Sequence, residues 1–406
     1  MTWPVVSLSK AIESVEVFVD GDWVESKDQD PDGDVRLVQL ADIGDGVYLD
    51  KSARFLTSAK ARELGCTFLK SEDVLVARMP DPLGRACIFP GDAKPSVTVV
   101  DVCIIRPNPM ELDARWLVHC LNAPECRNQI AGFANGTTRS RISRSNLGRI
   151  KLALPPLQEQ TRIAEVLDRA KALRAKRRNA LAQLDTLTQA IFLDHFGDPA
   201  INPKGLNIES LGKHLLFVTS GSRGWARFYA AKGIRFIRSL DVQMNYIGNA
   251  DMAFVIPPDN AEARRTRVRA NDVLLTITGS RIGRVAPVTK DLEDAHISQH
   301  VAILRLDPKC MEPVYASFFL SFETGGQRQI AMTQYGQTKP GLNFEQIRRF
   351  QIPVPPLQLQ RDFARRVAAV EKLKAAHVAS LAEMDALFAM LQRRAFRGDP
   401  PFRDSL

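Results

Sequence analysis

Three short runs in the second half of the chain carry arginines of the type and spacing that bind nucleic-acid phosphates and base edges. The first run is Arg264-Arg265-Thr266-Arg267-Val268-Arg269. If this run is extended, Arg265, Arg267 and Arg269 fall on one face and form a stripe that can follow a phosphate backbone. The alternative is a charged edge strand that blocks aggregation.

The other two runs place arginine on glycine-containing turns. Thr278-Gly279-Ser280-Arg281-Ile282-Gly283-Arg284 presents Arg281 and Arg284, and a guanidinium on such a turn can donate two hydrogen bonds to one guanine. A similar basic turn contains Gly221, Arg223, Gly224 and Arg227. We predict that both turns contact DNA.

Further candidates have weaker support from the sequence. In the first half they are basic residues near predicted turns, namely Arg78, Arg85, Lys94, Arg139 and Arg141. In the second half, Gln337 and Lys339 belong to the segment Gly336-Gln337-Thr338-Lys339-Pro340-Gly341-Leu342. These residues complete the predicted DNA-binding set.

The sequence lacks the patterns that commonly carry catalysis. Asp42-Ile43-Gly44-Asp45-Gly46 resembles the glycine turn of S-adenosylmethionine binders, but the matching segment Asp241-Val242-Gln243-Met244-Asn245 has no glycine. No G-x-x-x-x-G-K-[ST] phosphate loop is present. His296 and His300 lie four apart in a predicted strand without a third ligand, which favours ordinary histidines over a metal site. We predict a chain without catalytic residues, cofactor or metal.

The charge is unevenly distributed along the 406 residues. Residues 1–200 hold 26 Lys and Arg against 27 Asp and Glu, a net charge of −1. Residues 201–406 hold 29 against 19, a net charge of +10. A basic half favours a polyanionic partner, although solubility alone would also explain it. Residues 20–34 are acidic and are predicted to form a solvated loop.

Several features predict a cytoplasmic protein without a membrane partner. No apolar run reaches the roughly 18 residues that a bilayer requires. Met1-Thr2-Trp3-Pro4 lacks the basic and apolar blocks of a signal peptide. The six cysteines form no CxxC pair, and we expect reduced thiols.

The strongest feature of the sequence is an internal repeat with an offset of about 200 residues. Leu154-Pro155-Pro156-Leu157-Gln158-Glu159-Gln160 matches Val354-Pro355-Pro356-Leu357-Gln358-Leu359-Gln360, and the match continues without a gap to Phe196 and Phe396. Segments before these motifs also match, among them Asp73-Val74-Leu75 with Asp272-Val273-Leu274, and Ile104-Ile105-Arg106 with Ile303-Leu304-Arg305. The chain is therefore two tandem copies of one unit, each a globular part followed by a long segment.

The long segments are predicted to be helices. A Pro-Pro pair ends any earlier helix and suits a start just after it, and no Pro or Gly follows until Gly197. Apolar residues recur by three and four, the pattern of a coiled-coil seam. A helix of about 40 residues would be about 60 Å long, so we expect the two helices to pack on each other.

The predicted seam has a polar break near the middle of each helix. The break consists of Arg174 and Arg177 in the first helix and of Lys374 and His377 in the second. In an antiparallel pair the two breaks are expected to meet at one level. One interpretation is that Leu173 and Leu373 take over the seam while the charges extend outward. The other is a cationic layer that faces DNA or an acidic partner.

The globular parts show strand patterns separated by turn residues. Thr98–Ile105, Val273–Ile277 and Val301–Leu306 are predicted strand regions, whereas Trp116–Leu121 and Tyr315–Phe322 are predicted short apolar helices. The predicted fold class is α+β.

Together, the repeated motifs and the duplicated layout resemble the specificity subunit of type I restriction–modification enzymes. The motifs are the two Pro-Pro-Leu-Gln segments, the Phe196-Gly197-Asp198-Pro199 end of the first helix and the Gly336–Leu342 segment. The resemblance covers nearly the whole chain. Departures from it are mild: Arg397 adds one residue before the second Gly-Asp-Pro, and Leu359 replaces Glu159.

The resemblance implies two tandem, pseudo-symmetric target-recognition domains separated by two long helices packed as an antiparallel coiled coil. Its implied partners are double-stranded DNA, two methyltransferase (modification) subunits and restriction (motor and nuclease) subunits. The implied parts are a first target-recognition domain 1–153, a first spacer helix 154–196, a linker 197–205, a second target-recognition domain 206–353, a second spacer helix 354–396 and a tail 397–406.

Such a layout suits an asymmetric target in two parts. A two-fold DNA-binding protein normally requires a palindrome with half-sites about 34 Å apart. Two diverged copies in one chain retain that geometry while each copy reads a different sequence. Two alternatives stay open: a coiled-coil scaffold that binds only protein, and a self-contained DNA-modifying enzyme whose active site has no recognised motif.

Overall fold

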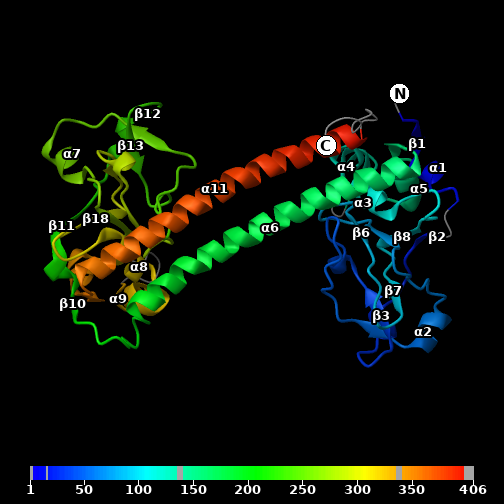
Figure 1. The fold of residues 1–406 in the computed structure, drawn as a ribbon, viewed down its shortest axis with the longest axis horizontal. Coiled ribbons are helices and arrows are strands. Elements are labelled where there is room, and N and C mark those ends of the chain that lie inside the picture. Colours follow the sequence, from blue (N-terminus) through cyan, green and yellow to red (C-terminus); the bar gives the residue numbers. More distant parts are fainter. Residues whose placement is uncertain (1–2, 15–16, 135–139, 335–340, 397–406) are drawn as a thin grey trace. The chain divides into compact units, whose positions relative to one another are not determined.

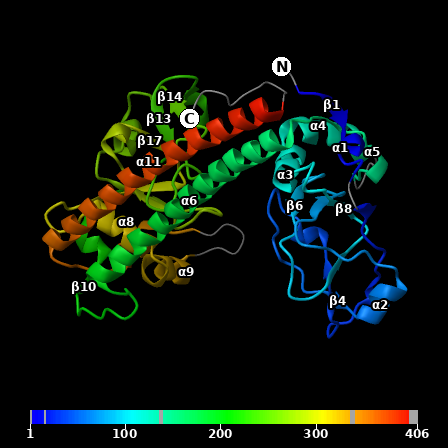
Figure 2. The same cartoon turned by 45° about the vertical axis from the view of Figure 1, so that its right-hand side comes forward.

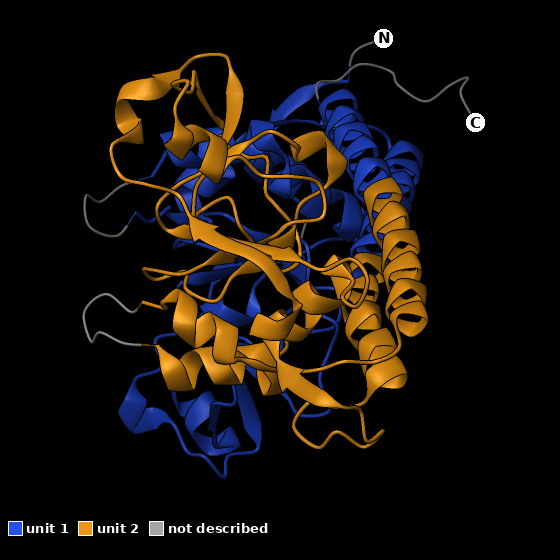
Figure 3. Ribbon diagram, turned by 90° about the vertical axis from the view of Figure 1, so that its left-hand side faces the viewer, with its two compact units in different colours: residues 1–179, 378–406 blue, residues 180–377 orange. Residues whose placement is uncertain are grey.

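The computed structural model describes residues 3–14, 17–134, 140–334 and 341–396. These residues form two compact units, which Figure 3 distinguishes by colour. Unit 1 comprises residues 1–179 and 378–406, and unit 2 comprises residues 180–377. The boundary falls within the two long helices, so each unit contains one part of both.

Unit 1 is an α+β unit built around a four-stranded antiparallel sheet of order β2-β8-β5-β6. A second sheet has the order β4-β3-β7, in which β3 and β7 are parallel, and β1 pairs with β9. The strands are β1 Val5–Ser7, β2 Val17–Asp20, β3 Val35–Val38, β4 Phe55–Leu56, β5 Val74–Ala77, β6 Ala86–Ile88, β7 Ser96–Thr98, β8 Val102–Arg106 and β9 Lys151–Ala153. The short helices are α1 Leu8–Ala11, α2 Ser58–Glu63, α3 Ala114–Asn122, α4 Pro124–Gly132 and α5 Arg144–Gly148.

Unit 2 repeats this topology. Its main sheet has the order β11-β18-β15-β16, its second sheet the order β12-β14-β13-β17, and β10 pairs with β19. The strands are β10 Ile208–Ser210, β11 Leu215–Ser220, β12 Tyr229–Ala230, β13 Ile234–Ile237, β14 Ala253–Val255, β15 Val273–Thr276, β16 Val285–Pro287, β17 His296–Ile297, β18 Val301–Leu306 and β19 Gln351–Pro353. The short helices are α7 Ala261–Thr266, α8 Pro313–Ser321, α9 Arg328–Thr333 and α10 Phe344–Arg349. The tandem α+β prediction is therefore confirmed.

One predicted strand region is divided in the structure. The apolar run 98–105 is not one strand, because β7 ends at Thr98 and β8 begins at Val102. Residues 99–101 form the connection between two different sheets, since β7 pairs with β3 and β8 with β2 and β5. A continuous apolar pattern does not reveal such a change of sheet.

The two predicted long helices are present as α6, Leu157–Phe196, and α11, Leu357–Phe396, each 40 residues long (Figures 1 and 2). Both begin three residues later than the predicted segments at 154 and 354. The reason is the Pro-Pro pair, because a residue before proline is pushed towards extended conformations. Gly197 follows α6 with a φ of 77°, a left-handed conformation that suits glycine at a helix end.

The helices run in opposite directions within each unit. In unit 1, Arg174 of α6 contacts Asp385 of α11 through Nε and Oδ1 at 2.5 Å. In unit 2, Asp185 of α6 contacts Lys374 of α11 through Oδ1 and Nζ at 2.9 Å. In unit 1 the start of α6 and the end of α11 enter one core, and in unit 2 the end of α6 and the start of α11 do so, which is the antiparallel arrangement that the repeat predicted.

The structure corrects the predictions for the polar breaks. Leu173 and Leu373 do not take over the seam, because their exposed fractions are 54% and 47%. Arg174 and Lys374 stay on the seam, where each pairs with an acid of the other helix. The breaks also do not meet at one level, since the two ion pairs lie 11 residues, or about 16 Å, apart along α6.

A cation on the seam is stabilised by more than its ion pair. The Arg174 guanidinium lies 4.3 Å from the centre of the Phe388 ring, a cation–π contact. Burial lowers the pKa of Lys374, but hydrogen bonds to Asp185 and Glu371 outweigh burial and raise it. Both cations are therefore held between the helices by contacts within the chain.

A buried glutamine ties the start of each long helix to its globular part. The Gln160 side chain accepts from the Asp113 backbone N–H at 2.9 Å and donates to the carbonyls of Pro155 and Glu111 at 3.0 and 3.3 Å. Gln360 has an equivalent set of three partners. They are the Glu312 N–H at 2.8 Å and the carbonyls of Pro355 and Cys310 at 2.8 and 3.0 Å. This role explains the last glutamine of the repeated Pro-Pro-Leu-Gln-x-Gln motif.

We expect Gln160→Leu to lower the free energy of unfolding by about 2–3 kcal/mol, because it leaves one buried donor and two acceptors without their partner. The matched control is Gln158→Leu, two residues earlier on the exposed face of α6. Urea denaturation of both variants measures the difference. An equal loss in both would show that Gln160 does not have this role.

Candidate nucleic-acid interface

The arginine run at 264–269 is not the extended stripe that its alternation predicted. Residues 261–266 form helix α7, and Asn260 caps it by accepting from the Ala263 N–H at 2.8 Å. The helix ends at Thr266, so Arg265 is helical whereas Arg267 and Arg269 lie in the segment after it, and neither the continuous stripe nor the edge strand forms. The capping asparagine and the Ala-Glu-Ala-Arg-Arg sequence that follows favour a helix over a strand.

Arg265 fastens α7 to the loop after β11. Its guanidinium donates to the Thr219 hydroxyl, to the Ser220 carbonyl at 2.9 Å and to the Ser222 hydroxyl at 3.0 Å. The next residue of that loop is Arg223, which is exposed. Arg265 therefore positions a basic loop beside α7.

Trp225 anchors the same loop through its buried side chain. Its side chain is 4% exposed, stacks on Phe236 with ring centres 5.3 Å apart, and donates to Glu262 of α7 at 3.3 Å. Gly224 precedes it with a φ of 86°. The anchor leaves Arg223 and Arg227 exposed on either side. The sequence predicted the basic turn but not the burial of this tryptophan. A large aromatic residue within a run of small and polar residues could have indicated it.

We define the α7 surface as the exposed arginines of α7 and of the adjoining segments, apart from Arg265, whose guanidinium binds the loop after β11. Arg264 is 67% exposed and pairs with Asp259 at 2.6 Å. Arg267 is 56% exposed, and its Nε lies 2.6 Å from Asp294 Oδ1. Arg269 is exposed as well. The members of the α7 surface are Arg223, Arg227, Arg264, Arg267 and Arg269.

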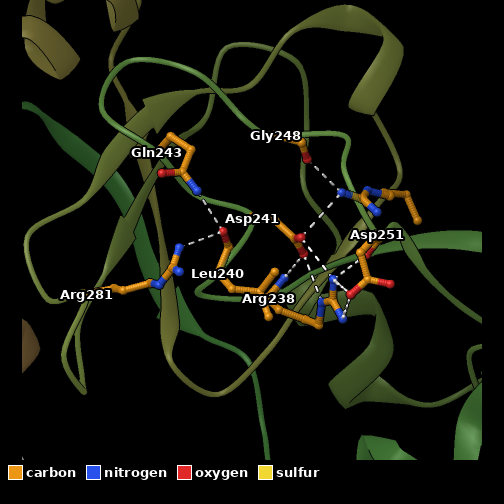
Figure 4. A network of polar contacts seen from close by, with 8 residues as sticks. Arg238, Leu240, Asp241, Gln243, Gly248, Asp251 and Arg281 are labelled. Carbon is orange, nitrogen blue, oxygen red and sulfur yellow. Dashed lines mark hydrogen bonds and ion pairs between the residues drawn. The ribbon is translucent and has the colours of Figure 1, made fainter. Parts of the chain in front are cut away.

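Arg281 and Arg284 lie on the connection between β15 and β16, and both reach back to the loop at 240–243. Arg281 donates to the Leu240 carbonyl at 3.1 Å (Figure 4). Arg284 donates to the Gln243 side chain. Gln243 in turn donates to the Leu240 carbonyl at 2.7 Å. These arginines therefore support a loop in the structure.

A buried carboxylate organises that loop. Asp241 accepts from the Arg238 backbone N–H at 2.8 Å and from its guanidinium at 3.1 Å, while Arg235 donates to the Gly248 carbonyl at 3.0 Å (Figure 4). Arg238 also contacts Asp251 at 3.4 Å. The hydrogen bond with Asp241 raises the pKa of Arg238, whereas burial lowers the pKa of Arg235.

Asp42 has the equivalent place in unit 1. It accepts from the backbone N–H groups of Gln39, Lys51 and Ser52, each at 2.7 Å. Asp42 is fully buried, as Asp241 nearly is. The carboxylate of the glycine-turn motif thus supports the loop, which gives the motif a structural role.

Two first-half candidates, Arg78 and Arg85, are buried among groups of the chain itself. Arg85 is 7% exposed and donates to the carbonyls of Ile43 and Leu40 at 2.6 and 2.7 Å, and to those of Met79 and Pro82 at 3.1 Å. Arg78 is 6% exposed, and its guanidinium pairs with Asp20 at 2.5 Å. Backbone and carboxylate oxygens of the chain surround both guanidinium groups, which gives the two arginines a structural role, and their contact with DNA stays a prediction.

The remaining first-half candidates differ in placement. Lys94 is exposed, donates to the Gly33 carbonyl at 3.2 Å and lies 4.6 Å from the centre of the Phe55 ring. Arg141 is half-buried and pairs with Asp101 at 3.0 Å. Arg139, Gln337 and Lys339 lie outside the described residues.

Ion pairs that sequence reasoning missed recur in both units. Asp73 accepts from the Arg106 guanidinium twice, each time at 2.7 Å. Asp272 accepts from Arg305 in the same way at 2.8 and 2.7 Å. Both members of each pair were among the repeated segments, so a search for oppositely charged residues retained together in the two copies would have found them.

The described residues show neither a metal centre nor a membrane-spanning helix. His296 lies in β17 beside Trp225, and His300 lies in the turn before β18. No group of three or more histidine, cysteine or acidic side chains in the described ranges is placed to hold a metal ion. None of the helices in these ranges is long and apolar enough to cross a bilayer.

Comparison with known sequences identifies one family. Residues 32–183 and 244–382 match the family described as the type I restriction modification DNA specificity domain. The specificity subunit of the type I restriction enzyme EcoBI from Escherichia coli is 24% identical over 346 residues, which are 76% of this chain and 70% of the relative. A putative type I restriction enzyme specificity subunit, MjaX, from Methanocaldococcus jannaschii is 20% identical over 311 residues, with 72% and 69% covered.

Solved structures share the fold. A chain from a study of complex assembly and conformational transition of the type I restriction–modification system aligns over 98% of both chains with a TM-score of 0.62 and 20% identity. The S subunit of a type I restriction–modification system from M. genitalium aligns over 100% of this chain and 97% of its own, with a TM-score of 0.57 and 15% identity.

Arg85→Ala should lower the free energy of unfolding by about 3 kcal/mol, because four backbone carbonyls lose a charged donor. The control is Arg54→Ala in the same unit, an exposed arginine whose guanidinium donates to the Gln29 side chain. We expect the control to change the free energy of unfolding by less than about 0.5 kcal/mol. Chemical denaturation compares the two, and a stable Arg85→Ala protein would contradict the structural role.

Proposed function

The chain belongs to the type I restriction–modification DNA specificity family, and we propose that it reads a DNA target in two parts for a complex whose chemistry other subunits perform. Family membership confirms the resemblance drawn from the repeated Pro-Pro-Leu-Gln motifs. The observation that carries the proposal is the duplicated unit: two α+β parts of one topology in one chain, each connected to both long helices.

We assign the two globular parts, 1–153 and 206–353, as the target-recognition domains. Exposed loops at equivalent positions of the two parts carry opposite charge. The acidic stretch 20–34 of unit 1 corresponds to the loop after β11 in unit 2, which carries Arg223 and Arg227. Trp23 of the acidic stretch is 68% exposed. Domains that diverge at the exposed loops while sharing a framework are suited to reading different half-targets, which makes the whole target asymmetric.

The α7 surface is the proposed phosphate contact of the second domain. Its five arginines are exposed, and the loop that carries two of them is anchored by Trp225 and Arg265. Phosphate contacts set the register of a protein on a duplex, whereas side chains that reach base edges specify sequence. Arg281 and Arg284 contribute by supporting the loop at 240–243.

The long helices are the proposed spacer. Each is a single helix without Gly or Pro, and a helix of 40 residues is about 60 Å long. Stiff connections of constant length would hold the gap between the half-targets constant. The polar ion pairs on the seam would also fix the register of the two helices against sliding.

The proposed partners are two methyltransferase subunits and the restriction subunits. The duplicated unit supports this stoichiometry, because it offers two equivalent surfaces to one kind of partner. A cytoplasmic location is part of the proposal, and the six cysteines are all free thiols in the structure, as reducing compartments require.

DNA binding by the full chain in complex with its modification subunit tests the proposal. We expect binding to one duplex sequence to survive excess random competitor DNA. Replacing both Arg223 and Arg227 with alanine should weaken binding and reduce the slope of log affinity against log salt by about 2, as expected when two phosphate contacts are lost.

The matched control replaces Arg348 and Arg349, two exposed arginines of α10, with alanine. It removes the same charge away from the α7 surface and should leave the salt slope unchanged. A complex that binds no duplex in preference to competitor would contradict the DNA-reading function. Equal salt slopes for the two double variants would show that Arg223 and Arg227 do not contact phosphates.

A further inference from the structure

The two copies differ in the side chains beside the loop that follows the buried carboxylates Asp42 and Asp241. In unit 1 the loop at 43–48 and in unit 2 the loop at 242–247 are closed by bridges between Ile43 and Tyr48 and between Val242 and Ile247. Gly46 and Asn245 occupy the same position in them. Each has a positive φ, 70° and 65°, and each donates its N–H to the adjacent β6 or β16 strand.

In unit 1 a lysine of α6 closes the space between this loop and the long helix. Lys171 Nζ donates to the Gly46 carbonyl at 2.5 Å. A side chain at position 46 would meet this amine, because a Cβ there would lie 2.7 Å from Lys171 Nζ. Burial lowers the pKa of Lys171. The glycine and the lysine therefore form a matched pair.

The remaining cavity in unit 1 is small and has a basic lining. Its volume is about 330 Å³. Its charged lining consists of Arg115, His119, Asp168 and Lys171. Asp168 is already occupied, since His119 contacts it at 2.7 Å and the hydrogen bond from His119 lowers its pKa.

Unit 2 lacks the closing lysine. Its position on α11 holds Glu371, and Asn245 replaces the glycine. The Asn245 side chain turns to α8, where it donates to the Ser321 hydroxyl at 2.9 Å and accepts from Ser317 at 2.8 Å. An open groove of about 640 Å³ remains, which is roughly twice the volume of the cavity in unit 1.

The groove of unit 2 combines acidic and aromatic side chains. The acids are Asp185, Asp291, Glu323 and Glu371, against the single cation Lys374, which Asp185 and Glu371 already bind. Tyr246 and Met244 line it and are 61% and 42% exposed. An excess of acids repels DNA phosphates, so this groove suits a cationic protein segment.

We propose that the groove beside Tyr246 is a docking slot for a lysine or arginine of the modification subunit. That side chain supplies in unit 2 the cation that Lys171 supplies within unit 1. Its aliphatic stem packs on Tyr246 and Met244, and its charged end lies among the carboxylates of the groove, which outnumber the single ammonium of Lys374. The inference rests on the proposed function, because the modification subunit is the partner proposed there.

A consequence is that the two equivalent docking positions differ. The modification subunit at unit 1 meets a slot that Lys171 has filled, whereas the one at unit 2 meets an open acidic slot. The two subunits therefore bind with different dependence on salt, and the contact at unit 2 weakens more as salt rises.

The test is the assembly of the full chain with the modification subunit, measured by native mass spectrometry and by titration at low and high salt. Glu371→Lys places a cation in the slot, as in unit 1, and should weaken one of the two binding events by about tenfold, or about 1.4 kcal/mol. Tyr246→Ser should weaken the same event. The charge-matched control is Glu383→Lys, an exposed glutamate of the same helix, which should bind as the unaltered chain does.

The outcomes separate this inference from the proposed function. If the unaltered chain assembles and binds DNA but Glu371→Lys and Tyr246→Ser bind both modification subunits normally, the slot is overturned and the proposed function stands. An equal loss with Glu383→Lys also overturns the slot. If the isolated chain dimerises and Glu371→Lys abolishes the dimer, a second copy is the occupant and the proposal is wrong. If the unaltered chain does not assemble, both fail.

Discussion

Each long helix ends inside a hydrophobic core to which the other repeat contributes most of the residues, and the rest of the molecule depends on this exchange. Phe196 at the end of α6 lies in the core of unit 2, with its ring centre 4.7 Å from that of Tyr315 and 5.3 Å from that of Phe363. Phe396 at the end of α11 lies in the core of unit 1, 6.3 Å from Trp116. Burial of such a side chain contributes about 2 kcal/mol, so each core requires the helix of the other copy.

A shared framework and diverged surfaces follow from this constraint. Buried polar groups that serve the framework recur in both copies, as Gln160 with Gln360 and Asp73 with Asp272 show. Exposed or groove-lining positions diverge, since Lys171 corresponds to Glu371. A buried polar group without its partner is costly, whereas a surface substitution is nearly neutral. The same physics therefore retains the framework and leaves the recognition surfaces open to change.

Much of the fold could be predicted because it depends on periodic and local signals. The repeat and the long helices were predicted from the sequence, whereas the ion pairs Asp73–Arg106 and Asp272–Arg305 were not, although both copies retain their residues. The start of α6 at Leu157 instead of 154 needed only the rule for residues before proline. The arginine run was misread, because alternation suggested a strand while the Asn260 cap specified a helix.

The candidate site was less predictable, because the role of an arginine depends on what surrounds it. Arg85 and Arg223 are both basic residues near turns, yet one is enclosed by four carbonyls and the other is exposed. Arg174 stays on the seam since an acid and an aromatic ring from the second helix meet it there. Partners that lie far apart in sequence, such as Arg174 and Asp385, can be matched only when the pairing of the helices is known.

In the proposed function, the length of the two long helices sets the gap between the two half-targets. Inserting seven residues into the middle of both α6 and α11 keeps the seam in phase and lengthens each helix by about 10 Å, roughly three base pairs of duplex. Mapping the methylated sites of cells that carry the complete system with the altered chain measures the result. The account predicts that both half-target sequences stay the same while the gap between them grows by about three base pairs. An unchanged gap, or methylation at a single continuous sequence, would contradict it.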